Sequence, residues 1–333
     1  MRAFVLTGYG AVADHVRLAT IPAPVAAEGE VLIDIHAASL NPIDFKLIHG
    51  NLKLISKYVL PRPFGFDASG IVAATGAGAS KFRPGDAVYV RASRDTIGTF
   101  AEQISLDEKI VARKPADITH AEAASLPLVG LTTLQNFNRA QARAGQRILI
   151  HAGSGGVGTF AVQYAKHLGL HVTSTTSSKN ADFVRALGAD RVIAYDRENY
   201  LEQGEDYDIV YDTLGGAFTV DAFKVVKRGG VVISISGPPD RKFGSTIGAG
   251  PLLRFAMWLK SRKVYAACAR AGATYYWAMA ESNGEQLREI AALVESGAIR
   301  PVVDREFEFG KLPEALAYLE AGRARGKVVL KVR

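Results

Sequence analysis

A short apolar run that stops at a glycine cluster, with a helical pattern behind it, constrains the fold of this chain most. Residues 148–150 are all apolar, which predicts a buried strand over 147–151. The segment 153–158 has the spacing G-x-G-x-x-G. Apolar residues then recur at i, i+3, i+4, i+7, i+8 and i+11 over 157–168, which predicts a helix with one buried face. Gly169 stands where a left-handed C-cap is needed.

A strand, a glycine turn and a helix in this order are typical of a dinucleotide-binding site. Gly153 permits a tight turn, Gly155 lets the backbone approach a pyrophosphate, and Gly158 lets the helix pack close to the strand. The helix N-terminus then offers free N–H groups to the phosphates. The alternative is a purely structural glycine loop. The residues predicted to bind the phosphates are Gly153, Ser154, Gly155, Gly156, Val157 and Gly158.

Composition excludes several classes of protein. A chain of 333 residues is long enough for two domains, and its one cysteine, Cys268, excludes internal disulfides and a cysteine-rich zinc lobe. The N-terminal apolar run is too short for a signal peptide, and the longest uncharged window, 148–165, holds four glycines, so no membrane span is expected. The net charge of +7 is scattered, so we expect a solvated basic surface and no nucleic-acid site. These features favour the cytoplasm.

The pattern of elements changes near residue 120. The first part is rich in short strands with Pro and Gly between them, which predicts a small, partly open barrel. Thr119 and Glu122 form a capping box that starts a helix. From residue 147 onward, strands and helices alternate, so the fold class is α/β with a doubly wound parallel sheet. The strands predicted in this part are 147–151, 171–175, 192–195, 208–212 and 231–235, and the helices are 157–168, 180–187 and 218–226.

The end of the chain is harder to interpret. Residues 252–269 predict helices, 273–279 a sixth strand, 283–295 a helix, and 328–332 a closing strand.

Seven short motifs in a fixed order resemble one family. They are Asn41-Pro-Ile-Asp44, Gly65-Phe-Asp-Ala-Ser-Gly70, Gly85-Asp-x-Val88, Gly130-Leu-Thr132, Ala152-x-x-Gly-x-x-Gly158, Tyr211-Asp212 and Gly326-Lys-Val-Val-Leu330. With them the chain resembles the medium-chain dehydrogenase/reductase superfamily, and in it the zinc-free branch of quinone oxidoreductases (zeta-crystallin-like) and alkenal/enone reductases. The resemblance implies a GroES-like catalytic domain over 1–123 and 280–333, and a Rossmann cofactor domain over 124–279.

The resemblance also bears on the metal. In the related zinc alcohol dehydrogenases a cysteine ligand stands where this chain has Asn41, and a Gly-His-Glu stands where it has Gly65-Phe66-Asp67. Phenylalanine cannot ligate zinc, and an asparagine amide replaces a thiolate poorly. We therefore expect no metal.

The second Rossmann strand bears on the cofactor. NAD-selective sites place an acid about 20 residues beyond the glycines, but here no acid precedes Asp182. Hydroxyl groups and a lysine suit a 2′-phosphate, so Thr176, Ser177 and Lys179 predict NADP(H). The alternative is a polar loop with an ordinary surface lysine.

Further cofactor contacts are implied by the resemblance. Thr132 would lie near the nicotinamide half, or cap the start of a helix. Tyr195 would lie near the adenosine, or pack in the core. Ser236 and Gly237 would face the nicotinamide ribose, and Lys327 lies in a motif assigned to the cofactor.

The same resemblance supplies catalytic candidates. Asn41 would polarise a substrate carbonyl, or simply form an Asn-Pro turn. Asp44 and Lys46 would orient Asn41 or relay a proton, or form a structural salt bridge. Relatives carry a Gly-x-Tyr-Pro tyrosine, which this chain lacks; Tyr58 is the nearest candidate for a proton donor, or else a packed or exposed tyrosine.

Without zinc, quinones and α,β-unsaturated carbonyls can accept hydride, because the charge moves onto an oxygen that needs only hydrogen-bond donors. The sequence thus predicts an NADPH-dependent quinone or enone reductase. The alternatives are a non-catalytic, crystallin-like NADPH-binding protein, a zinc alcohol dehydrogenase, and a nucleic-acid-binding protein. An apolar sixth strand at a sheet edge favours a homodimer.

Overall fold

The structure, a computed structural model, describes residues 1–53, 58–204, 206–240, 243–246, 248–277 and 279–333. The chain forms two compact units. Unit 1 comprises Met1–Leu131 and Glu281–Arg333, and unit 2 comprises Thr132–Ala280. The sequence placed the two boundaries at 123/124 and 279/280.

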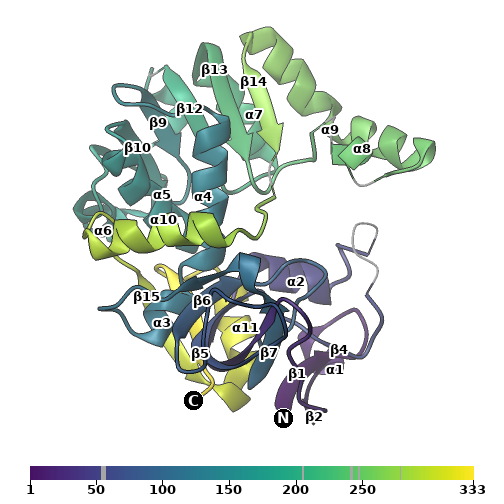
Figure 1. Cartoon of the computed structure of the whole chain (residues 1–333). Helices are drawn as coiled ribbons and strands as arrows, with labels where there is room; N and C mark the ends of the chain where they lie inside the picture. Colours follow the sequence, from purple (N-terminus) through teal and green to yellow (C-terminus); the bar gives the residue numbers. More distant parts are fainter. Residues whose placement is uncertain (54–57, 205, 241–242, 247, 278) are drawn as a thin grey trace. The chain divides into compact units, whose positions relative to one another are not determined.

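Unit 1 is built on strands that are antiparallel except for the parallel pair β15–β16, and they pack around a large apolar core (Figure 1). A seven-stranded sheet has the order β15-β16-β3-β5-β6-β8, with β7 paired to β3, and a three-stranded sheet has the order β2-β1-β4. The alternation of apolar residues over 30–36 predicts a half-buried strand, and in β3 the alternate residues Val31, Ile33 and Ile35 are fully buried, which confirms it. The elements of unit 1 are β1 Arg2–Leu6, α1 Val12–His15, β2 Val16–Thr20, β3 Glu30–Ser39, α2 Pro42–Ile48, β4 Arg62–Pro63, β5 Asp67–Thr75, β6 Ala87–Arg91, β7 Gln103–Asp107, β8 Val111–Arg113, α3 His120–Ala124, α10 Gly284–Glu295, β15 Val303–Glu308, α11 Leu312–Glu320 and β16 Lys327–Lys331.

Local signals explain where the helices of unit 1 begin. The capping box at Thr119 and Glu122 is present and starts α3. α2 and α11 lie outside the helices predicted from the sequence. α2 begins directly after Asn41, because Pro42 has the backbone angle of a first helical residue and the Asp44 carboxylate accepts the Asn41 backbone N–H at 2.7 Å.

Unit 2 contains the predicted doubly wound sheet (Figure 1). Its six strands are all parallel, in the order β11-β10-β9-β12-β13-β14. This is the order 3-2-1-4-5-6 of dinucleotide-binding folds. The elements are α4 Pro127–Arg139 (which crosses the unit boundary), β9 Arg147–Ile150, α5 Gly156–His167, β10 His171–Thr176, α6 Ala181–Ala186, β11 Arg191–Ala194, β12 Tyr207–Asp212, α7 Ala217–Asp221, β13 Val226–Ser234, α8 Phe243–Thr246, α9 Pro251–Ala271 and β14 Thr274–Trp277.

Two predicted elements of unit 2 differ in the structure. The helix predicted over 218–226 extends two residues too far: α7 ends at Asp221, a 3-10 turn continues it over Ala222–Lys224, and Val226 already begins β13. β-branched residues at 225 and 226 favour the strand. The helices predicted over 252–269 are one helix, α9, which ends at Gly272 with φ +63°. The strand predicted over 273–279 is β14; Ala278 lies outside the described residues. In the described part of the chain, no helix is long and apolar enough to cross a membrane.

Candidate cofactor and active-site residues

The glycine loop joins β9 to α5 and has the shape of a phosphate cradle. A Cβ on Gly153 would lie 2.1 Å from Ser174 Oγ, and one on Gly158 would lie 2.2 Å from the Ala152 carbonyl oxygen. Both glycines are therefore required by packing. A Cβ on Gly155 would meet only the Ala152 oxygen, at 3.4 Å, so this glycine is not required by the protein's own packing. The open side at Gly155, at the start of α5, is where an anion can approach the backbone.

The polar residues after β10 divide into two groups. Thr176 donates to Ser154 Oγ at 2.9 Å, which ties the strand end to the glycine loop, and Asn180 donates to the same oxygen at 3.3 Å. Ser177 is half-buried and Lys179 exposed. Within the described part of the chain, the side chains of Ser177 and Lys179 have no polar partner. They are available for a phosphate group.

The sequence analysis missed an acid beside this group. Asp196, just after β11, accepts the backbone N–H of Ser178 at 2.7 Å and its hydroxyl at 2.6 Å. These hydrogen bonds lower the pKa of Asp196. The rule of an acid about 20 residues beyond the glycines concerns the end of β10, so it does not identify Asp196, which follows β11.

A buried carboxylate organises the loop after β12. Asp212 Oδ1 accepts the backbone N–H groups of Leu214 at 3.0 Å and Gly215 at 2.9 Å, and Oδ2 accepts the hydroxyls of Thr219 and Ser234. Burial alone would raise its pKa, but hydrogen bonds, first that of His151, lower it to about 2. Asp212 lies in the Tyr211-Asp212 motif, which was the available signal for it.

Ser236 and Gly237 follow β13 on the same edge of the sheet. The Ser236 hydroxyl donates to the Thr213 carbonyl at 3.0 Å, and the Gly237 N–H donates to Ser234 Oγ at 2.7 Å. The loops after β12 and β13 are thus bonded to each other.

The structure decides two alternatives left open by the sequence. Thr132 lies inside α4, where its carbonyl accepts the Asn136 amide at 2.7 Å, so it does not cap a helix start. Tyr195 is 67% exposed, so it does not pack in the core.

In unit 1, strand register brings distant polar residues together. Ser39 of β3 pairs with Asp67 of β5 and with Val329 of β16. Asn41 lies two residues beyond Ser39, and Lys327 two residues before Val329. A buried cluster results, which we call the Asn41 cluster; its members are Ser39, Asn41, Asp44, Asp67 and Lys327.

Hydrogen bonds fill most of the bonding capacity of the Asn41 cluster. The Asn41 amide donates to Asp67 Oδ2 at 2.9 Å and to the Ser39 carbonyl at 3.3 Å, and its oxygen accepts from Lys327. Lys327 also donates to the Leu40 carbonyl at 3.0 Å and lies 3.6 Å from Asp67. Asn41 is therefore held in one orientation, with both amide hydrogens used. Asp67 was missed as a site residue, although it stands in the Gly65-Phe-Asp motif.

Burial shifts the charges of this cluster. It raises the pKa of Asp44 to about 8, against the opposing effect of the Asn41 N–H, and the neighbouring Asp67 raises it further. Burial also raises the pKa of Asp67 and lowers that of Lys327, while each of the two opposes the shift of the other. Asp44 Oδ1 has no hydrogen-bond partner among the described residues. With a pKa of about 8, Asp44 holds a proton near neutral pH.

The other two catalytic candidates are placed differently. Lys46 is on α2 but exposed, whereas Asn41 and Asp44 are buried. Tyr58 donates to the Arg94 carbonyl at 2.8 Å and has the Arg62 guanidinium 5.0 Å from its ring centre. Tyr58 is half-buried against the core of unit 1.

The residues at the expected zinc positions do not suit zinc. Phe66 is fully buried in the apolar core, and the Asn41 amide is already bonded to Lys327 and Asp67. In the part of the chain that the structure describes, no group of three or more His, Cys, Asp or Glu side chains could hold a metal.

Two family profiles match the chain. Residues 27–116 match the alcohol dehydrogenase GroES-like domain, and residues 187–330 match the domain described as zinc-binding dehydrogenase. The first match lies within unit 1, and the second runs from β11 of unit 2 to β16 of unit 1.

Individual proteins match over nearly the whole chain. A 2-methylene-furan-3-one reductase of Solanum lycopersicum is 35% identical, over 99% of this chain and 79% of that protein. A chloroplastic NADPH-dependent alkenal/one oxidoreductase of Arabidopsis thaliana is 34% identical over the same shares. The solved structure of a quinone oxidoreductase from Coxiella burnetii has a TM-score of 0.86 and 30% identity, and covers 100% of this chain and 99% of that one. The chain therefore belongs to the medium-chain dehydrogenase/reductase superfamily, in the group that contains the quinone oxidoreductases and alkenal/one oxidoreductases.

Proposed function

We propose that this chain is an NADPH-dependent reductase of quinones or α,β-unsaturated carbonyls that works without zinc. The observation that carries the proposal is the glycine loop, in which Gly153 and Gly158 are needed for packing while the Cβ position of Gly155 is left open for a ligand. The printed names of the relatives, an NADPH-dependent alkenal/one oxidoreductase and a quinone oxidoreductase, support the cofactor and the acceptor class.

The cofactor is assigned to side chains along one edge of the unit 2 sheet. The backbone N–H groups of residues 153–158 would bind the pyrophosphate. Ser177 and Lys179, which have no polar partner in the described part of the chain, would bind the 2′-phosphate beside Thr176. Exposed Tyr195 would lie against the adenosine. The candidates for the nicotinamide half are Thr132, Ser236 and Gly237.

Bound NADPH would supply a hydride to an electron-poor carbon, and the residues of unit 1 would handle the charge and the proton. Both amide hydrogens of Asn41 have partners, so we assign it a positioning role, and Lys327 holds it through its oxygen. The three partners of Lys327 support this role better than a direct cofactor contact. Asp44, with its raised pKa, would store the proton; Lys46 and Tyr58 remain candidates for its delivery.

Zinc independence rests on the donor set. The charge of Asp67 is countered by the buried Lys327 ammonium, so no cation is needed there, and Phe66 offers no ligand. The family profile described as zinc-binding dehydrogenase matches residues 187–330 and does not include these positions.

The test is the loss of NADPH absorbance with purified protein and a panel of acceptors: a short enone, a 2-alkenal, a benzoquinone and a naphthoquinone. Turnover with NADPH is expected, and weaker turnover with NADH. Tight NADPH binding without turnover of any acceptor would favour a non-catalytic role. Bound-metal analysis of the same sample should find less than one zinc per ten chains.

Two finer features belong to the same proposal. β14 is an edge strand of the described sheet and carries half-buried Tyr276 and Trp277, which favours a homodimer. Light scattering that gave a single-chain mass at micromolar concentration would contradict it. The sequence has a single cysteine, Cys268, which favours the cytoplasm; cell fractionation would test this.

A further inference from the structure

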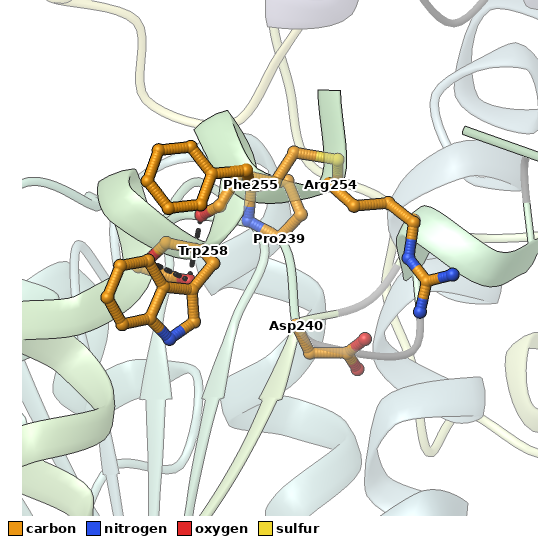
Figure 2. A pocket seen from close by; sticks show the side chains of 8 residues that line it. Pro239, Asp240, Arg254, Phe255 and Trp258 are labelled. Atoms are coloured by element: carbon orange, nitrogen blue, oxygen red, sulfur yellow. Dashed lines mark hydrogen bonds between the residues drawn. The ribbon is translucent and has the colours of Figure 1, made fainter. Parts of the chain in front are cut away.

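A pocket in unit 2 lies beneath the first half of α9, and none of its lining residues has been assigned a role so far. Its volume is about 310 Å³, which is at the lower end of the range for small-ligand sites. Figure 2 shows Phe255 and Trp258 together on one side, and Asp240 and the Arg254 guanidinium on the other. The lining residues are Pro239, Asp240, Gly244, Arg254, Phe255, Met257, Trp258 and Ser261.

The apolar wall of this pocket is unusually open to solvent. Phe255 is 61% exposed and Trp258 is 49% exposed, and their rings are stacked with centres 5.7 Å apart. Covering large exposed aromatic side chains with a ligand lowers the free energy, and aromatic rings make favourable contacts with other flat rings. The wall therefore suits a planar, apolar ligand.

The polar side chains of the pocket differ in how far they are already bonded. Asp240 is paired with Arg139 at 3.2 Å and accepts the Phe243 N–H at 3.0 Å. The Ser261 hydroxyl donates to the Met257 carbonyl at 2.9 Å. The Arg254 guanidinium has no hydrogen-bond or ion-pair partner among the described residues. A planar ligand with an oxygen at its rim would satisfy both the aromatic wall and this cation.

The position of the pocket relates it to the proposed cofactor site. Along the carboxyl edge of the sheet, Lys179 follows β10, the glycine loop follows β9, and Ser236 follows β13. A dinucleotide bound across this edge thus has its 2′-phosphate at β10 and its nicotinamide toward β13. Pro239 and Asp240 come shortly after Ser236, beside β14. The pocket lies at the nicotinamide end, away from Lys179.

We propose that this pocket binds the ring of an aromatic quinone, with Phe255 and Trp258 packed on the ring and Arg254 donating to a quinone oxygen. The proposal rests on the reductase function proposed above and narrows its substrate class. Phe255 and Trp258 of α9 would make the enzyme prefer a two-ring quinone to a short aliphatic enone, because the enone is too small to cover both aromatic rings.

The first test compares KM values for 1,4-naphthoquinone and but-3-en-2-one at saturating NADPH. Trp258→Ala should raise the KM for naphthoquinone about ten-fold, which corresponds to roughly 1.4 kcal/mol of ring contact, and leave that for the enone unchanged. Phe255→Ala should act in the same direction. Leu252→Ala is the matched control, since Leu252 is on the same helix, 87% exposed and outside the pocket. Equal KM values in Trp258→Ala and the natural chain, or an equal rise for both substrates, would overturn the proposal.

The second test needs no turnover. The chain has two tryptophans, so Trp277→Phe leaves Trp258 as the one fluorescent tryptophan. Naphthoquinone should quench Trp258 saturably, and Arg254→Gln should weaken the apparent affinity several-fold. Saturable quenching in a protein that reduces no acceptor would refute the reductase function and leave the pocket assignment standing. Turnover of acceptors without saturable quenching would refute the pocket assignment and leave the function standing.

Discussion

Three of the four glycines of the phosphate loop, Gly153, Gly155 and Gly158, make a sharp test, because the structure assigns them different tasks. Gly155 has φ −80° and ψ 172°, which alanine adopts without strain, and its added Cβ would meet only one atom, at 3.4 Å. Gly155→Ala should therefore fold normally and gain up to about 0.4–1 kcal/mol of stability through the unfolded chain. Its methyl group would nevertheless stand where a pyrophosphate must approach the backbone, so the Kd for NADPH should rise at least about ten-fold.

Gly158→Ala is the contrasting variant. Its Cβ would lie 2.2 Å from the Ala152 oxygen and 2.7 Å from the Gly153 Cα, both backbone atoms, so α5 must shift. Such overpacking costs about 1–3 kcal/mol, and the Tm should fall by roughly 2–4 °C per kcal/mol. Gly153→Ala should also lower the Tm, because its Cβ would lie 2.1 Å from Ser174 Oγ.

Both quantities are measured on the same preparations, the Kd by NADPH fluorescence titration and the Tm by scanning calorimetry. A Gly155→Ala protein with natural NADPH affinity would refute the assignment of the open side to the pyrophosphate. A Gly155→Ala protein with a lowered Tm would refute the packing argument.

Three other outcomes are expected. Lys179→Ala should raise the KM for NADPH about ten-fold and leave that for NADH unchanged, since only the 2′-phosphate meets the lysine; equal effects on both cofactors would contradict this. Asp44 has a folded-state pKa of about 8, above its unfolded value, so its contribution to stability is complete below about pH 4 and is lost as the pH rises toward 8. The unfolding free energy, measured by urea titration, should therefore fall less steeply with pH in Asp44→Asn than in the natural chain, by up to about 1.4 kcal/mol per pH unit in that range. An unchanged slope would show that Asp44 is ionised when folded. Incubation with EDTA followed by dialysis should leave turnover unchanged, whereas loss of activity restored by zinc would disprove zinc independence.

The cofactor half of the fold was accessible from the sequence because its signals are local. The apolar run of β9, the glycine loop and the face of α5 lie within about 22 consecutive residues, and Gly169 caps the helix with φ +77° as expected. The error at 218–226 has the same origin. The helical spacing of apolar residues continues past Asp221. Val226 is nevertheless in a strand, because β13 pairs with β12, and this tertiary contact cannot be read from local spacing.

The catalytic half was less accessible, because its site depends on register between strands far apart in the chain. Asn41 and Asp67 were visible as motif positions, yet nothing local shows that Lys327 lies between them. That follows only when β16 returns to pair with β3, and β3 with β5. The same register explains why the amide of Asn41 is fully bonded, which changes its role from a direct donor to a positioning residue.

The charges of Asp44, Asp67 and Lys327 in the Asn41 cluster must be considered together, because all three side chains are buried. Asp67 has two buried cations near it, since the Lys327 ammonium lies 3.6 Å away and the buried Arg91 guanidinium also lowers its pKa. For Asp44 the effect of Lys327 is the smallest of the named causes, and burial raises its pKa to about 8, so a proton on Asp44 avoids a costly buried charge. The cluster thus holds a proton next to the asparagine that it orients. A reductase that delivers hydride from NADPH also needs a proton, because each turnover leaves an oxygen anion to be protonated.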